Sequence, residues 1–494
     1  MKTSSIFIRP SLGLMLLLAG LMSVHVRAAS NAVHQATGLK ICEVNDQSAI
    51  VWTRLTKNAA PVSADGPLPV ITYDGNMRAP KGSNRPNTQP AVNFPGGVTV
   101  DQLQGAAPGA AGQTRVLYRA RGESAWQNTP WQEVEAGRDF TRQHRLSPLA
   151  AGTTYEIRVE GRTTPAGAVS SALDGQFRTA PAVGAPAPIR FVVITCQNYH
   201  TRDLPTEGWK IYDRILALRP DFFVHTGDVL YYDGWAKSAA LARWMWQQTY
   251  SMPTNVRFHR TLASYFIKDD HDTWMNDCYP TMKTAFMGDF TFAQGQEIFR
   301  EQIGLGATSY RTFRWGKHLQ IWLVEGRDFR SPNDAPDGPD KTIWGVEQKA
   351  WFKRTVQASD ATFRVLISPT PLVGPDRSAK NDNHANKGFT HEGDELRAFC
   401  AAQKNMVVLC GDRHWQYASV HAKTGLQEFG SGPTTDQHAG GWPVDRKESE
   451  QSYVNVVGGF LEGEVELGGP KPLLIFRHRS VDGKVLNEDM VGAK

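Results

Sequence analysis

The stretch DFFVHTGDVLY at residues 221–231 decides the fold. Its first half is a short apolar run, which is typical of a strand buried on both faces of a sheet. The run ends on a polar motif in which Asp228 and Tyr231 stand three residues apart. In layered α/β sheets ligands lie beyond the carboxyl ends of the strands, so the stretch predicts a functional site at that edge.

Three further stretches repeat this pattern of a buried strand followed by polar side chains. Helical stretches at residues 209–218, 346–356 and 393–403 lie between several of the strands, and this alternation predicts a layered α/β domain over residues 189–494. Four such strand ends can converge on one crevice. The three added motifs are Cys196-Gln197 after residues 189–195, Asp269-Asp270-His271-Asp272 with Asn276-Asp277 after residues 264–268, and Gly411-Asp412-Arg413-His414 after residues 406–409.

The ligand types at these strand ends indicate two metal ions. A thiolate, a phenolate and an imidazole, from Cys196, Tyr231 and His414, suit a borderline or redox-capable ion such as ferric iron. Carboxylate and amide oxygens suit calcium, magnesium or manganese. Two cations bridged by one carboxylate, for which Asp228 is the candidate, would clamp a tetrahedral oxyanion and activate a water. This chemistry predicts hydrolysis of a phosphoester.

Each motif also has a structural interpretation when it is taken alone. An Asp after a strand commonly caps a helix, and a lone Cys196 is more often a buried apolar residue than a ligand. Asp412 and His414 could be a structural hydrogen-bonded pair, and the acidic motif around His271 could be a solvated turn. The joint placement at strand ends favours the metal site.

Jointly, the motifs resemble the alkaline phosphatase D family of calcineurin-like metallophosphatases. The segment GRDFRSP at residues 326–332 and the helix EQKAWFK at residues 347–353 are similar to that family as well, although Lys268 stands where the family often has Trp. The resemblance implies a two-sheet sandwich flanked by helices that holds ferric iron and calcium.

The resemblance also assigns roles to single residues. It places His271 near the leaving group, as the general acid. It makes Arg327 and Arg413 candidates for binding phosphate oxygens. For the metals it implies iron held by Cys196, Asp228, Tyr231 and His414, and calcium held with the help of Asp228, Asn276 and Asp412.

Residues 33–179 read as strands and turns, and they predict an all-β fibronectin type III-like sandwich ahead of the α/β domain. Trp52 is a predicted core residue, and Tyr155 is placed to close a corner with its hydroxyl. Residues 61–112, rich in Pro and Gly, are expected to be a long surface insertion, and residues 180–188 a stiff linker.

Residues 1–28 have the pattern of a secretory signal peptide: a positive start, an apolar run at residues 12–22, and a small-x-small end at Val26-Arg27-Ala28. They predict a secreted or periplasmic protein without a transmembrane anchor. The formal net charge of +5 over 494 residues, with no long basic runs, gives no indication of sequence-specific nucleic-acid binding. The expected partner is a small or polymeric phosphoester, either a monoester or a diester.

Five cysteines in an exported chain are an odd number, so at least one is unpaired. Pairing among Cys42, Cys278, Cys400 and Cys410 is left open by the sequence.

Two other functions compete with the leading one. In the first, Cys196 is a nucleophile with His271 as its base. In the second, the protein binds a surface through its sandwich domain, and its metals are structural. The segment 376–392, which contains His384 and His391, is interpreted as a surface loop, with a role in substrate choice as the alternative.

Overall fold

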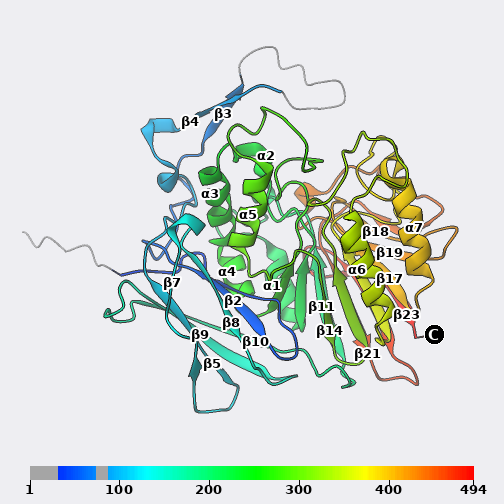
Figure 1. Cartoon of the computed structure of the whole chain (residues 1–494), viewed down its shortest axis with the longest axis horizontal. Coiled ribbons are helices and arrows are strands. Elements are labelled where there is room, and N and C mark those ends of the chain that lie inside the picture. Colours follow the sequence, from blue (N-terminus) through cyan, green and yellow to red (C-terminus); the bar gives the residue numbers. More distant parts are fainter. Residues whose placement is uncertain (1–31, 74–86, 494) are drawn as a thin grey trace, which may run out of the picture. The chain divides into compact units, whose positions relative to one another are not determined.

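The computed structural model describes residues 32–73 and 87–493, and two large β-sheets form its framework (Figure 1). The first sheet has nine strands, and three parallel neighbours from the region after residue 188 lie at its centre. In spatial order the strands are β23 (Val485–Gly492), β22 (Leu473–Arg479), β21 (Phe460–Glu466), β11 (Ile189–Ile194), β12 (Phe222–His225), β13 (Ala263–Phe266), β1 (Leu39–Cys42), β2 (Ala49–Arg54) and β8 (Thr141–Leu146).

The second sheet has seven strands, and four of them run parallel in its middle. In spatial order they are β14 (Arg311–Trp315), β15 (Leu319–Leu323), β16 (Phe363–Ser368), β17 (Met406–Cys410), β19 (Gln427–Ser431), β18 (Gln416–Val420) and β20 (Gln451–Asn455).

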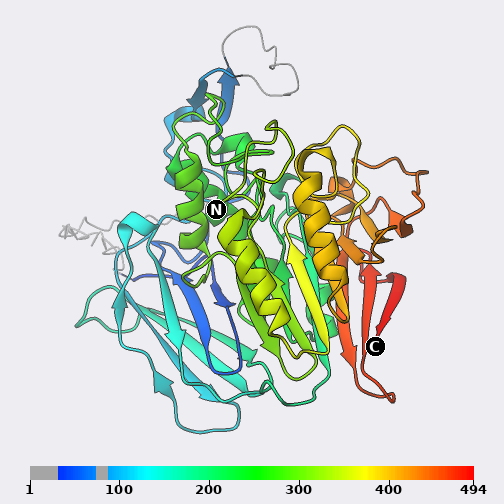
Figure 2. The ribbon, with the colours of Figure 1, turned by 45° about the vertical axis from the view of Figure 1, so that its right-hand side comes forward.

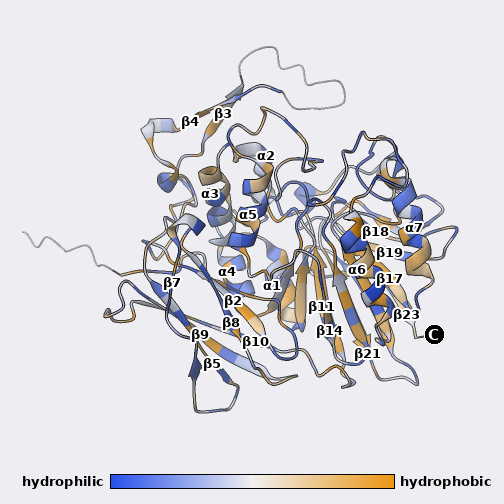
Figure 3. Ribbon diagram, viewed as in Figure 1, coloured by the Kyte–Doolittle hydropathy of each residue, from blue (hydrophilic) through white to orange (hydrophobic). Residues whose placement is uncertain are grey.

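The two sheets share one hydrophobic core. Phe191 and Val193 of β11 belong to the same buried cluster as Ile321 of β15. The intervening residues Val192 and Ile194 belong to a second cluster, which they form with α1 (Lys210–Leu218) and α4 (Pro253–His259). Because successive side chains on a strand point to opposite faces, this division shows β11 buried on both faces, as its apolar run predicts. The central strands are accordingly among the hydrophobic parts of the ribbon (Figure 3).

Helices cover the outer face of the second sheet as well. Trp322 and Leu366, from β15 and β16, pack with Phe352 of α6 (Gly345–Gln357) and Leu396 of α7 (Thr390–Ala401). Figure 2 shows these two helices in front of the strands. The predicted helices are therefore present, with ends shifted by a few residues. The remaining helices are α2 (Tyr232–Trp235), α3 (Ala239–Tyr250) and α5 (Phe292–Gln302), and the 3₁₀ helices η1 (Pro95–Gly97), η2 (Val100–Gln102), η3 (Ala136–Arg138), η4 (Tyr199–Thr201), η5 (Lys387–Phe389) and η6 (Asp436–His438).

The N-terminal strands differ from the prediction. β1 pairs in parallel with β13, so that β1, β2 and β8 extend the nine-stranded sheet. A separate fibronectin type III-like domain is therefore not confirmed. An alternating pattern in the sequence indicates that a strand has a buried face, but it does not indicate which strand lies next to it. That neighbour is set by contacts between residues more than 200 positions apart, such as Ile41 with Ala263. The other N-terminal strands form a small sheet of β10 (Ser171–Arg178), β9 (Thr154–Arg162), β5 (Gln113–Ala120), β6 (Gln127–Asn128) and β7 (Gln132–Glu133).

Two single-residue predictions for this region are confirmed. The Tyr155 hydroxyl accepts a hydrogen bond from the backbone N–H of Ala150 at 2.8 Å, which closes the predicted corner. Trp52 is fully buried, and its indole N–H donates to the carbonyl of Glu301 in α5 at 2.8 Å. The second contact again joins the N-terminal strands to the α/β part.

The described part of the predicted insertion is anchored to the α/β part. Its hairpin of β3 (Val70–Tyr73) and β4 (Pro90–Asn93) brings the ring of Tyr73 onto Phe286, with the ring centroids 5.4 Å apart. Leu103 is fully buried, and the carbonyl of Gln104 accepts from the Trp244 indole of α3 at 3.0 Å. The insertion therefore covers α3 and the loop that contains Phe286.

The predicted export signal at residues 1–28 lies outside the described residues. None of the helices within residues 32–73 and 87–493 has the length and apolar character that crossing a lipid bilayer requires.

Candidate metal centre and active site

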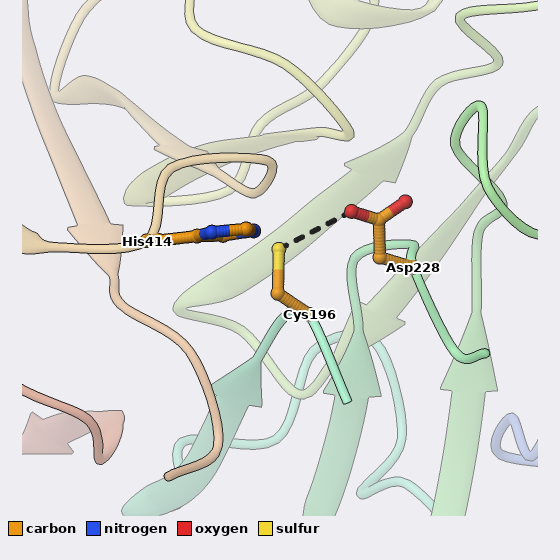
Figure 4. Close-up of side chains that lie close together, drawn as sticks. All are labelled: Cys196, Asp228 and His414. Carbon is orange, nitrogen blue, oxygen red and sulfur yellow. Dashed lines mark hydrogen bonds between the residues drawn. The ribbon is translucent and has the colours of Figure 1, made fainter. Parts of the chain in front are cut away.

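The strand ends converge as the sequence predicts. Cys196 and Asp228 follow the neighbouring parallel strands β11 and β12, while His414 comes from the loop after β17 (Figure 4). The two sheets meet here closely, because a Cβ atom on Gly411 would lie 2.6 Å from the Thr226 hydroxyl and 2.7 Å from that of Thr195. One site is therefore assembled from both sheets.

The backbone at these strand ends is unusual. Cys196, Asp228 and Asp412 all have left-handed conformations, with φ values of 54°, 53° and 65°. Such conformations are costly for residues other than glycine, and they concentrate at functional sites. Here each one falls just after its strand has ended, where the chain turns the side chain into the crevice.

The first ligand cluster contains the four residues predicted to hold iron. Ligand atoms of Cys196, Asp228 and His414 all lie within 4.8 Å of one another. The Cys196 Sγ is 3.4 Å from Asp228 Oδ2. The Tyr231 hydroxyl is 3.2 Å from that same oxygen and 3.3 Å from His414 Nε2. The structure therefore brings all four together.

Two further clusters share Asp228 with the first. One joins Asp228 to Asp269 and Asp412, and the other joins it to Asp270 and His271, in each case within 4.8 Å. Asp228 is thus the common member of all three groups, as its proposed bridging position requires. The sequence motif assigns Asp269 no ligand role, yet its carboxylate lies in the group that contains Asp412.

The electrostatics of this centre fit bound cations. Asp228 Oδ1 and Asp269 Oδ2 are buried and have no hydrogen-bond donor among the described residues. Burial raises the pKa of Asp228 well above its usual value, although the charge of His271 opposes the shift. Burial also raises the pKa of Asp412 to about 6, against the opposing charge of Arg413. Carboxylates in such a position need a positive partner to stay ionised.

The thiol and the phenol at the centre follow the same logic. Burial, and then the negative charge of Asp228, raise the pKa of Cys196 and of Tyr231 well above their usual values. Burial, and then the charge of His438, keep the pKa of His414 well below its usual value, so its imidazole is neutral and able to coordinate. One group of ligands contains a soft thiolate and the neighbouring group contains carboxylates, so the two groups suit a softer and a harder cation.

His271 forms a pair with a residue that sequence reasoning missed. Its Nδ1 lies 2.7 Å from Asp233 Oδ1 at the start of α2. Asp233 also accepts from the backbone N–H of Asn276 at 3.1 Å, through its other oxygen. This backbone contact is how Asn276 is joined to the site. The only signal for Asp233 in the sequence is its place two residues after Tyr231.

The two predicted phosphate-binding arginines are buried and paired with carboxylates. Arg327 is fully buried and donates from Nε to Asp269 Oδ1 at 2.6 Å. Arg413 is 1% exposed, and its Nη2 lies 2.6 Å from Asp412 and 3.1 Å from Asp376. Their observed contacts position the site carboxylates, and contact with phosphate stays a prediction.

The segment 376–392 is only in part the surface loop that its composition indicated, because Lys387 and His391 are exposed but other residues are buried. Asp382 and His384 are each 1% exposed, and His384 Nε2 lies 3.0 Å from Glu392 Oε2. Lys380 lies 2.8 Å from Asp277, just beyond the His271 motif. Ion pairs with residues far away in the sequence hold the buried residues of this segment in place. A local sequence pattern does not reveal such ion pairs.

His438 is a second residue that the sequence did not indicate. Its Nε2 lies 2.9 Å from the Tyr231 hydroxyl and 3.2 Å from His414 Nε2. Burial, and then the charge of His271, lower its pKa to about 4, so it is neutral near pH 7. It lies in η6, which follows the buried strand β19, but the sequence of that strand, QEFGS, is not a continuous apolar run. All five cysteines are buried and unpaired, which settles the open disulfide question in favour of none.

The fold and this centre define a phosphatase of the metallophosphatase type. The family model of the PhoD-like phosphatases matches residues 191–277 and 296–457, and the chain belongs to this family. It is accordingly a phosphoric ester hydrolase. No curated protein matches the chain.

Two solved structures share the fold. One is the structure of PhoD, with 16% sequence identity and a TM-score of 0.68, in which the match covers 92% of this chain and 88% of that one. The other is the purple acid phosphatase PPD1 from seeds of yellow lupin (Lupinus luteus), with 11% identity and a TM-score of 0.59, covering 90% of this chain and 80% of that one.

The close approach of two strand ends gives a test of the site geometry. A Cβ atom at Gly227, where φ is 108°, would lie 2.6 Å from Asp269 Cβ. Gly227→Ala should therefore displace Asp228 or Asp269 and lower kcat/KM by about 100-fold, the cost of a misplacement near 1 Å. Gly122→Ala is the control, because Gly122 has a φ of 94° but a Cβ atom there would have no neighbour within 4 Å. Equal activity in the two variants would show that the approach of these strand ends does not set the site geometry.

Proposed function

We propose that the chain is an exported phosphoesterase that uses two metal ions at these strand ends. The observation that carries the proposal is the position of Asp228, which is buried, shared by all three ligand groups, and left with an unpaired oxygen. Export rests on the signal-peptide pattern of residues 1–28. The substrate is a phosphomonoester or phosphodiester, small or polymeric.

The ligand assignment follows the chemistry of the donors. Cys196, Asp228, Tyr231 and His414 would hold one ion, for which ferric iron suits the thiolate, phenolate and imidazole. Asp228, Asn276 and Asp412 would contribute ligands to the second ion. Their oxygen donors suit calcium, magnesium or manganese. When bound, the two ions would supply Lewis-acid stabilisation of the phosphoryl oxygens and a nucleophilic water.

The residues around the ions would orient the substrate and move protons. With its Nδ1–H donated to Asp233 at 2.7 Å, the doubly protonated ring of His271 would present its second proton, at Nε2, to the departing ester oxygen. The pairing with Asp233 fixes the orientation of the ring. Arg327 and Arg413 would keep Asp269 and Asp412 in place through their ion pairs, and the sequence predicts that they also contact phosphate.

The two competing functions have less support. Cys196 is fully buried and has a raised pKa, and both properties oppose a nucleophilic role. The hypothesis of a non-catalytic surface-binding protein does not account for membership of a phosphatase family.

Replacing the thiol tests the metal centre. Cys196→Ser should lose bound iron and reduce activity on 4-nitrophenyl phosphate by at least about 100-fold, since even residues behind metal ligands are worth 10–100-fold. Chelation should abolish the activity of the wild-type protein. Cys400→Ser is matched for burial and should keep both metal and activity. Activity that survives complete removal of metal would rule out the proposed mechanism.

The proton donor has its own test. His271→Gln should slow hydrolysis of an alkyl phosphate by about 10²–10⁴-fold, the usual contribution of a general acid. Hydrolysis of 4-nitrophenyl phosphate should slow much less, because 4-nitrophenolate leaves without a proton. Asp233→Asn should show the same substrate dependence in weaker form. An equal loss on both esters would show that His271 does not protonate the leaving group.

A further inference from the structure

A polar pocket lies beside the metal centre and takes no part in the mechanism above. Its volume is about 310 Å³, and its walls come from residues 373–397 together with His421. One wall is Asp376, whose carboxylate lies 3.1 Å from Arg413. Arg413 also pairs with Asp412 at 2.6 Å, so its guanidinium group links the pocket wall to a proposed metal ligand.

Two cations at the pocket have no carboxylate partner of their own among the described residues. Lys387 is exposed and forms no ion pair with any residue in the described ranges. Arg377 has a side chain that is 36% exposed, and its nearest carboxylate is Asp376 at 3.6 Å. Asp376 already pairs with Arg413 at a shorter distance, so a single carboxylate stands between two guanidinium groups. The walls therefore carry an excess of positive charge.

A third cation builds the inner wall of the pocket. Arg397 donates from Nη1 to the carbonyls of Leu372 and His384, each at 2.7 Å, and its Nη2 pairs with Asp394 at 2.7 Å. This network fixes the wall and neutralises Arg397. Ser378 lines the same space. The pocket thus combines a wall held by Arg397 with two cations, Arg377 and Lys387, that have no carboxylate partner of their own among the described residues.

We propose that this pocket binds a phosphate-like oxyanion outside the metal centre. A guanidinium and an ammonium offer several N–H donors to one tetrahedral anion, and charge-assisted hydrogen bonds of this kind are the strong ones. The volume exceeds that of an isolated phosphate and leaves room for an organic group. The anion is either a second phosphate group on the substrate or free phosphate released by the reaction.

Anion binding at this pocket is coupled to the metal centre through Asp376. An anion that engages Arg377 draws that guanidinium away from Asp376. The carboxylate is then left to Arg413, which holds Asp412. Occupancy of the pocket therefore alters the support of Asp412 without contact to the reacting atoms.

Calorimetry on the full chain after metal removal isolates the pocket. Without its ions the metal centre has lost the cations that would bind phosphate there, so the difference in phosphate binding between the wild type and a pocket variant reports on the pocket. Arg377→Gln with Lys387→Gln should weaken this binding by at least about tenfold, since each lost contact is a charge-assisted hydrogen bond. The control pair Arg354→Gln with Lys404→Gln removes the same charges from exposed positions outside the pocket and should bind as wild type does.

Kinetics of the metal-loaded enzyme separate the two sources of the anion. If the pocket holds a second phosphate of the substrate, the double variant raises KM for a sugar bisphosphate more than KM for the matching monophosphate. If it holds free phosphate, the ratio of the two KM values stays the same and the noncompetitive part of phosphate inhibition disappears. Absence of phosphate binding to the metal-free wild type, or equal binding by the double variant and its control, would overturn the proposal. Because this binding is measured without metal, a failure of the metal mechanism would not be mistaken for a failure of the pocket.

Discussion

The crowding of buried carboxylates around Asp228 is the constraint on which the rest of the structure depends. Asp228, Asp269 and Asp270 are each at most 2% exposed. An ionised carboxylate in such a place is costly unless positive charge surrounds it. Arg327 and Arg413, themselves buried, compensate part of this charge, and Asp228 Oδ1 and Asp269 Oδ2 are left without donors among the described residues. Bound cations would complete the balance of charge.

That constraint explains why distant parts of the chain surround the site. The segment 376–392 brings Asp376 against Arg413 and Lys380 against Asp277, so it holds the positive partners and the loop beyond the His271 motif in position. In the nine-stranded sheet β1 lies next to β13, and β13 is the strand that leads into Asp269. The N-terminal strands are therefore part of the scaffold of the site rather than an attached module.

The central strands of the α/β part, and the polar residues directly after them, could be predicted from the sequence. A strand buried on both faces leaves a continuous apolar run, and parallel neighbours must end at one edge, which is why Cys196 and Asp228 could be placed together. His414 joins them from the loop after β17 in the second sheet. Asp233 and His438 were missed because they lie in the short helical turns α2 and η6, farther along the chain than the residues directly after strands β12 and β19. Two features depend on contacts between residues far apart in the sequence: the pairing of β1 with β13, and the partial burial of segment 376–392. The local amino-acid composition does not indicate these contacts.

Anomalous diffraction from crystals of the metal-loaded protein, recorded on both sides of the iron absorption edge, would locate the two ions directly. We expect an iron-specific peak within bonding distance of Cys196, Asp228, Tyr231 and His414. We also expect a second peak, without the iron signal, that shares Asp228 and lies near Asp412. Iron located elsewhere, or no metal at Asp228 in fully active protein, would contradict a two-metal site bridged by Asp228.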